Sequence, residues 1–166
     1  MPRIAVTGHM NLTPETTTLV RAALHDRLRE AAGDEEPLVG LSCLAEGADA
    51  LFAAAILDVG GTLCAILPAP DYRREKVAPG YAPEFDRLIA AAELVTVLPF
   101  PRSNRTAYEA ANTVLLAAAD RLIAVWDGQG AVDRGGTAAV VEDAHTRDLP
   151  VDVVWPQGAR RQIPTG

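Results

Sequence analysis

The sequence has 166 residues, a formal net charge of −7 and a pI near 4.9, with 49% apolar residues and only 5% aromatic ones. This length is typical of one domain with a core of its own, built here mostly from aliphatic side chains. A chain this acidic is not expected to bind nucleic acid broadly or to attach to an anionic membrane, because both partners need a basic face.

No apolar run is long enough to span a membrane, and the N-terminus lacks the pattern of a secretory signal, so a cytoplasmic location is expected. The two cysteines, Cys43 and Cys64, lie in or beside apolar runs and are expected to be buried thiols rather than a disulfide or a metal pair. The three histidines are far apart and have no cysteine partners at metal spacing. Neither a metal nor a cofactor is therefore expected.

The first unit of the chain is predicted to be a strand, a loop and a helix. Residues 3–7 form a short apolar run, and Gly8 and His9 begin the loop after it. Thr13 and Pro14 are typical of an N-cap followed by proline in the first helical position. His9 would lie at the carboxyl end of the strand, where it could contact a ligand. The alternative is a local role as a cap or turn residue.

The second unit repeats this order. Residues 37–43 predict a strand, and the apolar face of a helix begins near Ala48. Between them, Gly47 would permit a close backbone approach, and Glu46 or Asp49 could accept hydrogen bonds from a sugar. For Asp49 the alternative is that its charge complements the positive end of the helix dipole.

Residues 62–67 predict the third strand, and residues 93–98 predict the fourth. The polar, proline-rich stretch from 69 to 81 is either a functional lid or a solvated connection with a short helix. A helix with one apolar side is predicted to start at Pro83 and to lead into the fourth strand.

Two arginines, Arg102 and Arg105, follow the fourth strand. They are candidates for an anion clamp because a guanidinium group matches the geometry of phosphate. A solvated surface pair is the alternative. The helix predicted over residues 106–119 has an apolar surface wider than one contact with a sheet requires, which favours a homodimer.

The stretch from Asp127 to Thr137, DGQGAVDRGGT, joins an apolar strand to an alanine-rich helix. Its glycines let backbone N–H groups come close to a ligand, and the helix start adds free N–H groups and a positive dipole end. These features predict a phosphate seat at Gly135, Gly136 and Thr137. A flexible turn is the alternative.

The alternation of strands and helices predicts an α/β fold, with a six-stranded parallel sheet covered by helices on both faces. The last two strands are expected over residues 121–126 and 151–155. One domain is expected over residues 1–156, followed by a frayed tail over 157–166. Right-handed crossovers place the loops after the strands at one edge, where ligands bind. The residues expected there are Gly8, His9, Glu46, Gly47, Asp49, Arg102, Arg105 and the loop from Asp127 to Thr137.

These motifs resemble those of the SLOG superfamily, a group of Rossmann-like domains that includes the LOG, DprA and YpsA-like proteins. The resemblance covers about residues 3–155. It implies a three-layer Rossmann-like fold with strand order 3-2-1-4-5-6 and a site for a nucleotide or nucleotide-like ligand. The residues that carry it are Ile4-Ala5-Val6-Thr7-Gly8-His9, Leu44-Ala45-Glu46-Gly47-Ala48-Asp49, Ile66-Leu67-Pro68, Arg105 and Gly135-Gly136-Thr137.

LOG proteins hydrolyse the N-glycosidic bond of cytokinin nucleotides with an arginine after the fourth strand and a glutamate in a GGxGTxxE loop. Arg105 is similar to that arginine, but Val140 stands at the glutamate position, and Glu142 would lie on the far side of the helix. The resemblance thus favours binding or sensing of a small phosphate-bearing ligand. The alternative is an N-glycosidase (phosphoribohydrolase) acting on nucleoside 5'-monophosphates, with Asp127 or Glu109 replacing the glutamate.

Overall fold

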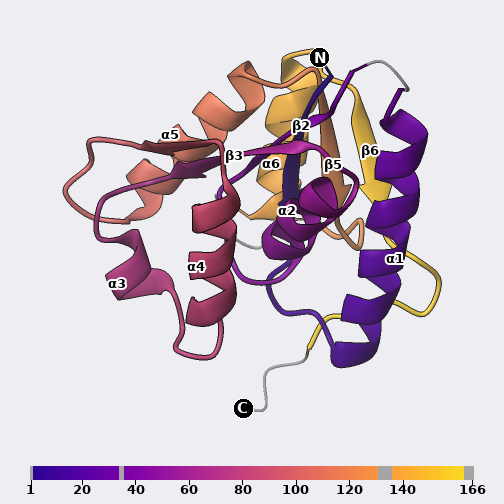
Figure 1. The fold of residues 1–166 in the computed structure, drawn as a ribbon, viewed down its shortest axis with the longest axis horizontal. Coiled ribbons are helices and arrows are strands. Elements are labelled where there is room, and N and C mark those ends of the chain that lie inside the picture. The colour runs from indigo at the N-terminus through magenta and orange to yellow at the C-terminus, as the bar shows by residue number, and fades with distance from the viewer. Residues whose placement is uncertain (1, 34–35, 131–135, 163–166) are drawn as a thin grey trace.

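The computed structural model describes residues 2–33, 36–130 and 136–162. Over these ranges the chain alternates between strands and helices and forms one parallel six-stranded sheet between two layers of helices (Figure 1). The elements in chain order are β1 (Arg3–Gly8), α1 (Pro14–Ala31), β2 (Val39–Ser42), α2 (Ala48–Asp58), β3 (Thr62–Leu67), α3 (Tyr72–Lys76), α4 (Ala82–Ala91), β4 (Leu94–Val97), α5 (Arg105–Ala117), β5 (Arg121–Val125), α6 (Thr137–Thr146) and β6 (Val151–Val154).

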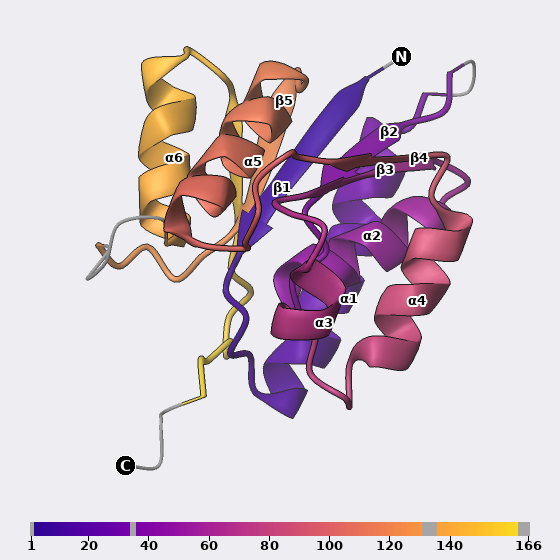
Figure 2. The same cartoon turned by 90° about the vertical axis from the view of Figure 1, so that its left-hand side faces the viewer.

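The two faces of the sheet bury separate hydrophobic clusters. Ile4 and Val6 of β1 point into the cluster shared with α1, α2 and α4, whereas Ala5 between them belongs to the cluster under α5 and α6. Figure 2 shows α5 and α6 on one side of the sheet and the other helices on the opposite side. Because successive side chains of a strand alternate between faces, a central strand covered on both sides must be apolar throughout.

The expected three-layer α/β architecture is confirmed, but the expected strand order 3-2-1-4-5-6 is not. The order is β4-β3-β2-β1-β5-β6, with β4 beside β3 instead of beside β1. Helix α4 packs against α2, on the same face as the preceding crossovers. The connection from β3 to β4 therefore places β4 at the outer edge of the sheet, beyond β3. The next connection, through α5, runs over the opposite face and brings β5 beside β1.

The strand order thus reverses between β1 and β5. These two strands pair in parallel from Ile4 and Arg121 to Gly8 and Val125, so their carboxyl ends lie side by side. In open α/β sheets, the crevice outside such a reversal point is where ligands bind.

The polar stretch over residues 69–81 contains the short helix α3, which matches the expected connection with a short helix. Asp71, just before that helix, accepts hydrogen bonds from the backbone N–H and the hydroxyl of Ser103, at 2.9 and 2.7 Å. These bonds tie the stretch to the loop after β4. In the described ranges, no helix is long and apolar enough to cross a membrane.

The C-terminal segment differs from the expected frayed tail as far as it is described. Arg161 forms an antiparallel bridge with Leu12, and the backbone N–H of Gln162 donates to the Asn11 carbonyl at 2.6 Å. The backbone N–H of Arg160 donates to the Thr16 hydroxyl, also at 2.6 Å. Residues up to 162 are therefore attached beside the loop that follows β1. Residues 163–166 lie outside the described ranges.

Candidate functional site

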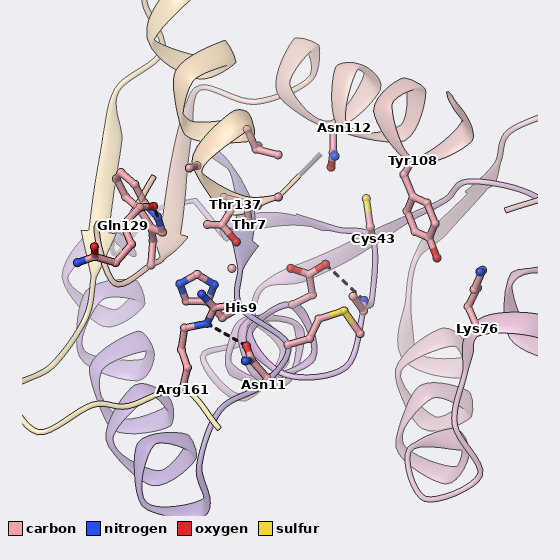
Figure 3. Close-up of a pocket in the computed structure, with 18 of the residues that line it drawn as sticks. Thr7, His9, Asn11, Cys43, Lys76, Tyr108, Asn112, Gln129, Thr137 and Arg161 are labelled. Carbon is pink, nitrogen blue, oxygen red and sulfur yellow. Dashed lines mark hydrogen bonds between the residues drawn. The ribbon is translucent and has the colours of Figure 1, made fainter. Parts of the chain in front are cut away.

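A cavity of about 580 Å³ opens at the carboxyl ends of β1, β2 and β5, at the point where the strand order reverses. The loop after β1, the starts of α2 and α6, helices α3 and α5, the loop after β5 and the C-terminal segment also contribute to its walls (Figure 3). Five of the residues expected at the site line it, namely Gly8, His9, Asp49, Gly136 and Thr137.

His9 joins the ends of three strands. Its backbone N–H donates to the Val125 carbonyl at 3.1 Å, and its Nε2 atom accepts from the Asp127 backbone N–H at 3.2 Å. Its ring packs edge-on against Trp155, with centroids 5.6 Å apart. Burial is the main cause that lowers the pKa of His9, and nearby Arg161 lowers it further, against the opposing effect of Asp127. The lowered pKa favours the neutral form of His9 at pH 7.

The carboxylate of Asp127 is bound by other residues of the chain. Its Oδ1 accepts from the Gln129 backbone N–H at 3.0 Å and lies 3.3 Å from His9 Nε2, while Oδ2 lies 3.7 Å from Arg161. Burial acts to raise the pKa of Asp127, but the Gln129 hydrogen bond and the nearby His9 and Arg161 outweigh it, so the net shift is downward. A carboxylate with this pKa is ionised and engaged, and is a poor proton acceptor near pH 7.

Two glycines bring α2 against the loop after β1. A Cβ on Gly8 would lie 2.4 Å from the Ala48 Cβ, closer than real Cβ contacts come. Gly47 has φ +92°, and a Cβ there would lie 2.8 Å from the His9 carbonyl oxygen. The close approach expected of Gly47 is thus made to the chain's own backbone, and Gly47 does not line the cavity.

The N-terminus of α6 faces the cavity. Gly136 is the N-cap residue, no side chain of the described residues caps the helix, and its first turn contains no acidic residue. Thr137, Ala138 and Val140 line the cavity beside it. N–H groups in the first turn of a helix have no intrahelical acceptor, and the dipole makes this end positive. Gly135, the third residue of the expected phosphate seat, lies outside the described ranges.

Asp49 is a buried carboxyl in the cavity wall. Its only hydrogen bond among the described residues comes from the Ala45 backbone N–H, at 3.4 Å. Burial raises the pKa of Asp49 to about 7, although the Ala45 hydrogen bond opposes the shift. Asp49 also contributes to the raised pKa values of Tyr72 and Cys43, after the effect of their own burial, so these three side chains lie close together.

The other expected residues do not reach the cavity. Arg102 and Arg105 are exposed and lie outside its lining, and so do Glu46 and Glu109. For Arg102 and Arg105, this arrangement matches the alternative of a solvated surface pair. On α6, Val140 lines the cavity and Glu142 is exposed, which agrees with the helix register expected for them.

Several residues that line the cavity were not identified from the sequence. Tyr108 and Asn112 are one helical turn apart on α5, within a surface that was expected to make a homodimer. That surface is divided between the core and the cavity, because Ala111, Leu115 and Leu116 are buried against the sheet. Lys76 and Arg161 supply the cations, and nothing in the sequence pattern links Arg161 to a loop 150 positions earlier.

No protein-family model matches the sequence, and no curated protein matches it. Solved structures with the same fold do exist. DNA processing protein A (DprA) from Streptococcus pneumoniae has a TM-score of 0.69 at 19% identity over 95% of this chain and 52% of its own. DprA from Helicobacter pylori has a TM-score of 0.67 at 16% identity, over 96% and 68%. The molybdenum cofactor carrier protein from Chlamydomonas reinhardtii has a TM-score of 0.59 at 17% identity, over 95% and 78%.

At these identities the likeness shows the fold alone, and it confirms the expected Rossmann-like α/β fold. The chain spans about half the length of the Streptococcus pneumoniae protein. The Helicobacter pylori structure describes single-stranded DNA binding by a protein of this fold. That finding contradicts the expectation, drawn from net charge, of no broad binding to nucleic acid. The expected homodimer is not shown by any of these likenesses.

Proposed function

We propose that this chain uses its SLOG fold to bind a small nucleotide or nucleotide-derived ligand, with the phosphate at the N-terminus of α6. The observation that carries the proposal is the start of α6, which no described side chain caps and which faces a cavity at the point where the strand order reverses. Free N–H groups and the positive dipole end favour an anion there. The cavity volume of about 580 Å³ lies within the range typical of small-ligand sites.

Two further observations support an anionic ligand. Arg161 lines the cavity beside His9, and Lys76 lines it from α3. Lys76 makes no ion pair or side-chain hydrogen bond with any other described residue, so its charge is available. The neighbouring folds support the same class of function, since one binds single-stranded DNA and another is named as a cofactor carrier.

The N-glycosidase alternative depended on Asp127 or Glu109 in place of the missing glutamate. Glu109 is exposed outside the cavity, and the Asp127 carboxylate is engaged by the Gln129 backbone N–H and by Arg161. Neither acid is placed to activate a water molecule in the cavity. We therefore propose binding without appreciable turnover.

The experiment is a thermal-shift panel of inorganic phosphate, adenosine, AMP, ADP and a single-stranded oligonucleotide. A ligand at 100 times its dissociation constant should stabilise the protein by about 2.7 kcal/mol. Thr137→Glu places a negative charge at the proposed phosphate position and should abolish the AMP shift. Thr18→Glu, which adds the same charge on the exposed side of α1, should not.

The absence of a shift with every phosphate-bearing compound would contradict the proposal, and so would an AMP shift that Thr137→Glu leaves unchanged. Chromatography of the same mixtures tests turnover. Release of free adenine from AMP by the wild-type protein, lost in Asp127→Asn or Asp49→Asn, would establish the N-glycosidase instead.

A further inference from the structure

The cavity has two ends of different chemistry. Figure 3 shows His9, Thr137 and Arg161 toward one side, and Tyr108, Asn112 and Lys76 toward the other. We call the first group, with Gly136, the phosphate end. We call Asp49, Tyr72, Tyr108 and Asn112 the polar end. Within the described residues, the side chains of Tyr72, Tyr108 and Asn112 make no hydrogen bond, although all three line the cavity.

Asp49 is the carboxyl group of the polar end. A carboxylate can accept about four hydrogen bonds. This one is only 9% exposed and accepts one bond of 3.4 Å. Among the described residues, only the Ala45 backbone N–H favours its charged form, and no cation offsets its burial. A buried carboxyl with so few donors is costly unless something outside the chain completes it.

The groups around Asp49 favour a flat heteroaromatic donor. The rings of Tyr72 and Tyr108 lie edge to face with centroids 6.2 Å apart, and Tyr108 is half-buried. Aromatic rings provide surfaces against which a planar base packs well. The hydroxyl groups of both tyrosines and the Asn112 amide can donate or accept, which suits the mixed edge of a nucleobase. A ligand held by its phosphate at α6 would extend its base in this direction.

We propose that the polar end is a nucleobase subsite in which Asp49 accepts a hydrogen bond from an exocyclic amino group. The site would then select bases that carry this group over those with a carbonyl oxygen in its place. The inference rests on the proposed function, because the phosphate end positions the other part of the ligand. Above pH 8, where Asp49 is mostly ionised, an oxo base would set one acceptor against another at its carboxylate, with no donor between them.

The experiment is isothermal titration with two matched nucleotide pairs, AMP against IMP and CMP against UMP. Each pair differs in the replacement of an amino group by a carbonyl oxygen. The wild-type protein should bind the amino member roughly tenfold to a hundredfold more tightly. Asp49→Asn should remove or reverse this preference, because its amide can donate to a carbonyl oxygen. The matched control is Glu46→Gln, which removes a charge from the same loop but at an exposed position outside the cavity.

Other results would overturn the inference in distinguishable ways. Equal affinity of the wild-type protein for both members of each pair would refute the base subsite but leave the phosphate seat intact. A lower affinity for 2',3'-dideoxy-AMP than for AMP that disappears in Asp49→Asn, without any amino preference, would assign Asp49 to the sugar. Failure of every nucleotide to bind would remove both this inference and the proposed function. Retained AMP binding by Asp49→Asn, at reduced selectivity, shows that the variant is folded.

Discussion

The Nε2 atom of His9 accepts a hydrogen bond of 3.2 Å from the backbone N–H of Asp127. These residues follow β1 and β5, the two strands between which the strand order reverses. The bond therefore joins the loops after β1 and β5 at the crevice where a ligand is expected to bind in such a sheet. His9 has the local role in a loop that the sequence left open, and it also lines the cavity, where its contact with a ligand stays a prediction.

We expect His9→Leu to lower the free energy of unfolding by about 1–3 kcal/mol, because the Asp127 N–H loses its acceptor. His9→Gln should recover part of this loss, since its side-chain oxygen can replace Nε2. Urea unfolding measures both. His145→Leu, at an exposed position on α6, should change the stability by less than about 0.5 kcal/mol. Equal midpoints for His9→Leu and the wild type would show that the bond contributes nothing.

We expect Asp49 to make the protein less stable as the pH rises. Burial raises the pKa of Asp49 from 3.8 to about 7, so folding favours its protonated form. The stability linked to this proton is complete below about pH 4 and is lost as the pH rises through 7. Asp49→Asn should therefore gain stability relative to the wild type between pH 5 and pH 8, by on the order of 3 kcal/mol.

The measurement is urea unfolding of both proteins at each pH. The difference between them isolates Asp49 from His9, whose lowered pKa gives the opposite slope below pH 6.5. Asp26→Asn removes a charge from the exposed face of α1 and controls for net charge. A difference between wild type and Asp49→Asn that does not vary with pH would contradict the buried state of this carboxyl.

We expect Arg161→Gln to weaken binding of AMP by roughly threefold to tenfold, because a partly exposed charge is screened by solvent. Arg161 is held at the cavity by a 3.1 Å bond from its Nε to the Asn11 side-chain oxygen. Titration at low and high salt should show a weaker salt dependence in the variant. Arg160→Gln, at the adjacent exposed position, removes the same charge and should behave like the wild type. Identical affinities for the two variants would exclude Arg161 from the site.

Local patterns were enough to predict most elements of the fold. Thr13 caps α1 by accepting from the Thr16 backbone N–H at 3.2 Å, and Pro14 occupies the first turn as expected. The helical register that placed Val140 and Glu142 on different sides of α6 also holds. Such features depend on residues within one or two turns of each other, so the sequence contains all the information they need.

The position of β4 illustrates what local patterns lack. The pattern of an apolar strand followed by a polar loop does not show whether the strand pairs with β1 or with β3. Pairing of Cys64 with Leu94 depends on which face α4 covers, which is decided by its packing against α2. The placement of β4 carries Arg102 and Arg105 to the surface, outside the cavity.

By itself, the sequence determined the α/β class, the parallel sheet, the strand ends that face the site and the glycine-rich start of α6. These follow from hydrophobic periodicity and from the backbone chemistry of glycine, both of which are local. The tertiary structure alone decided that Asp49 is buried and that Arg161 reaches the loop after β1. Burial and charge depend on residues distant in the chain, and for this reason the polar end of the cavity became visible only in the folded protein.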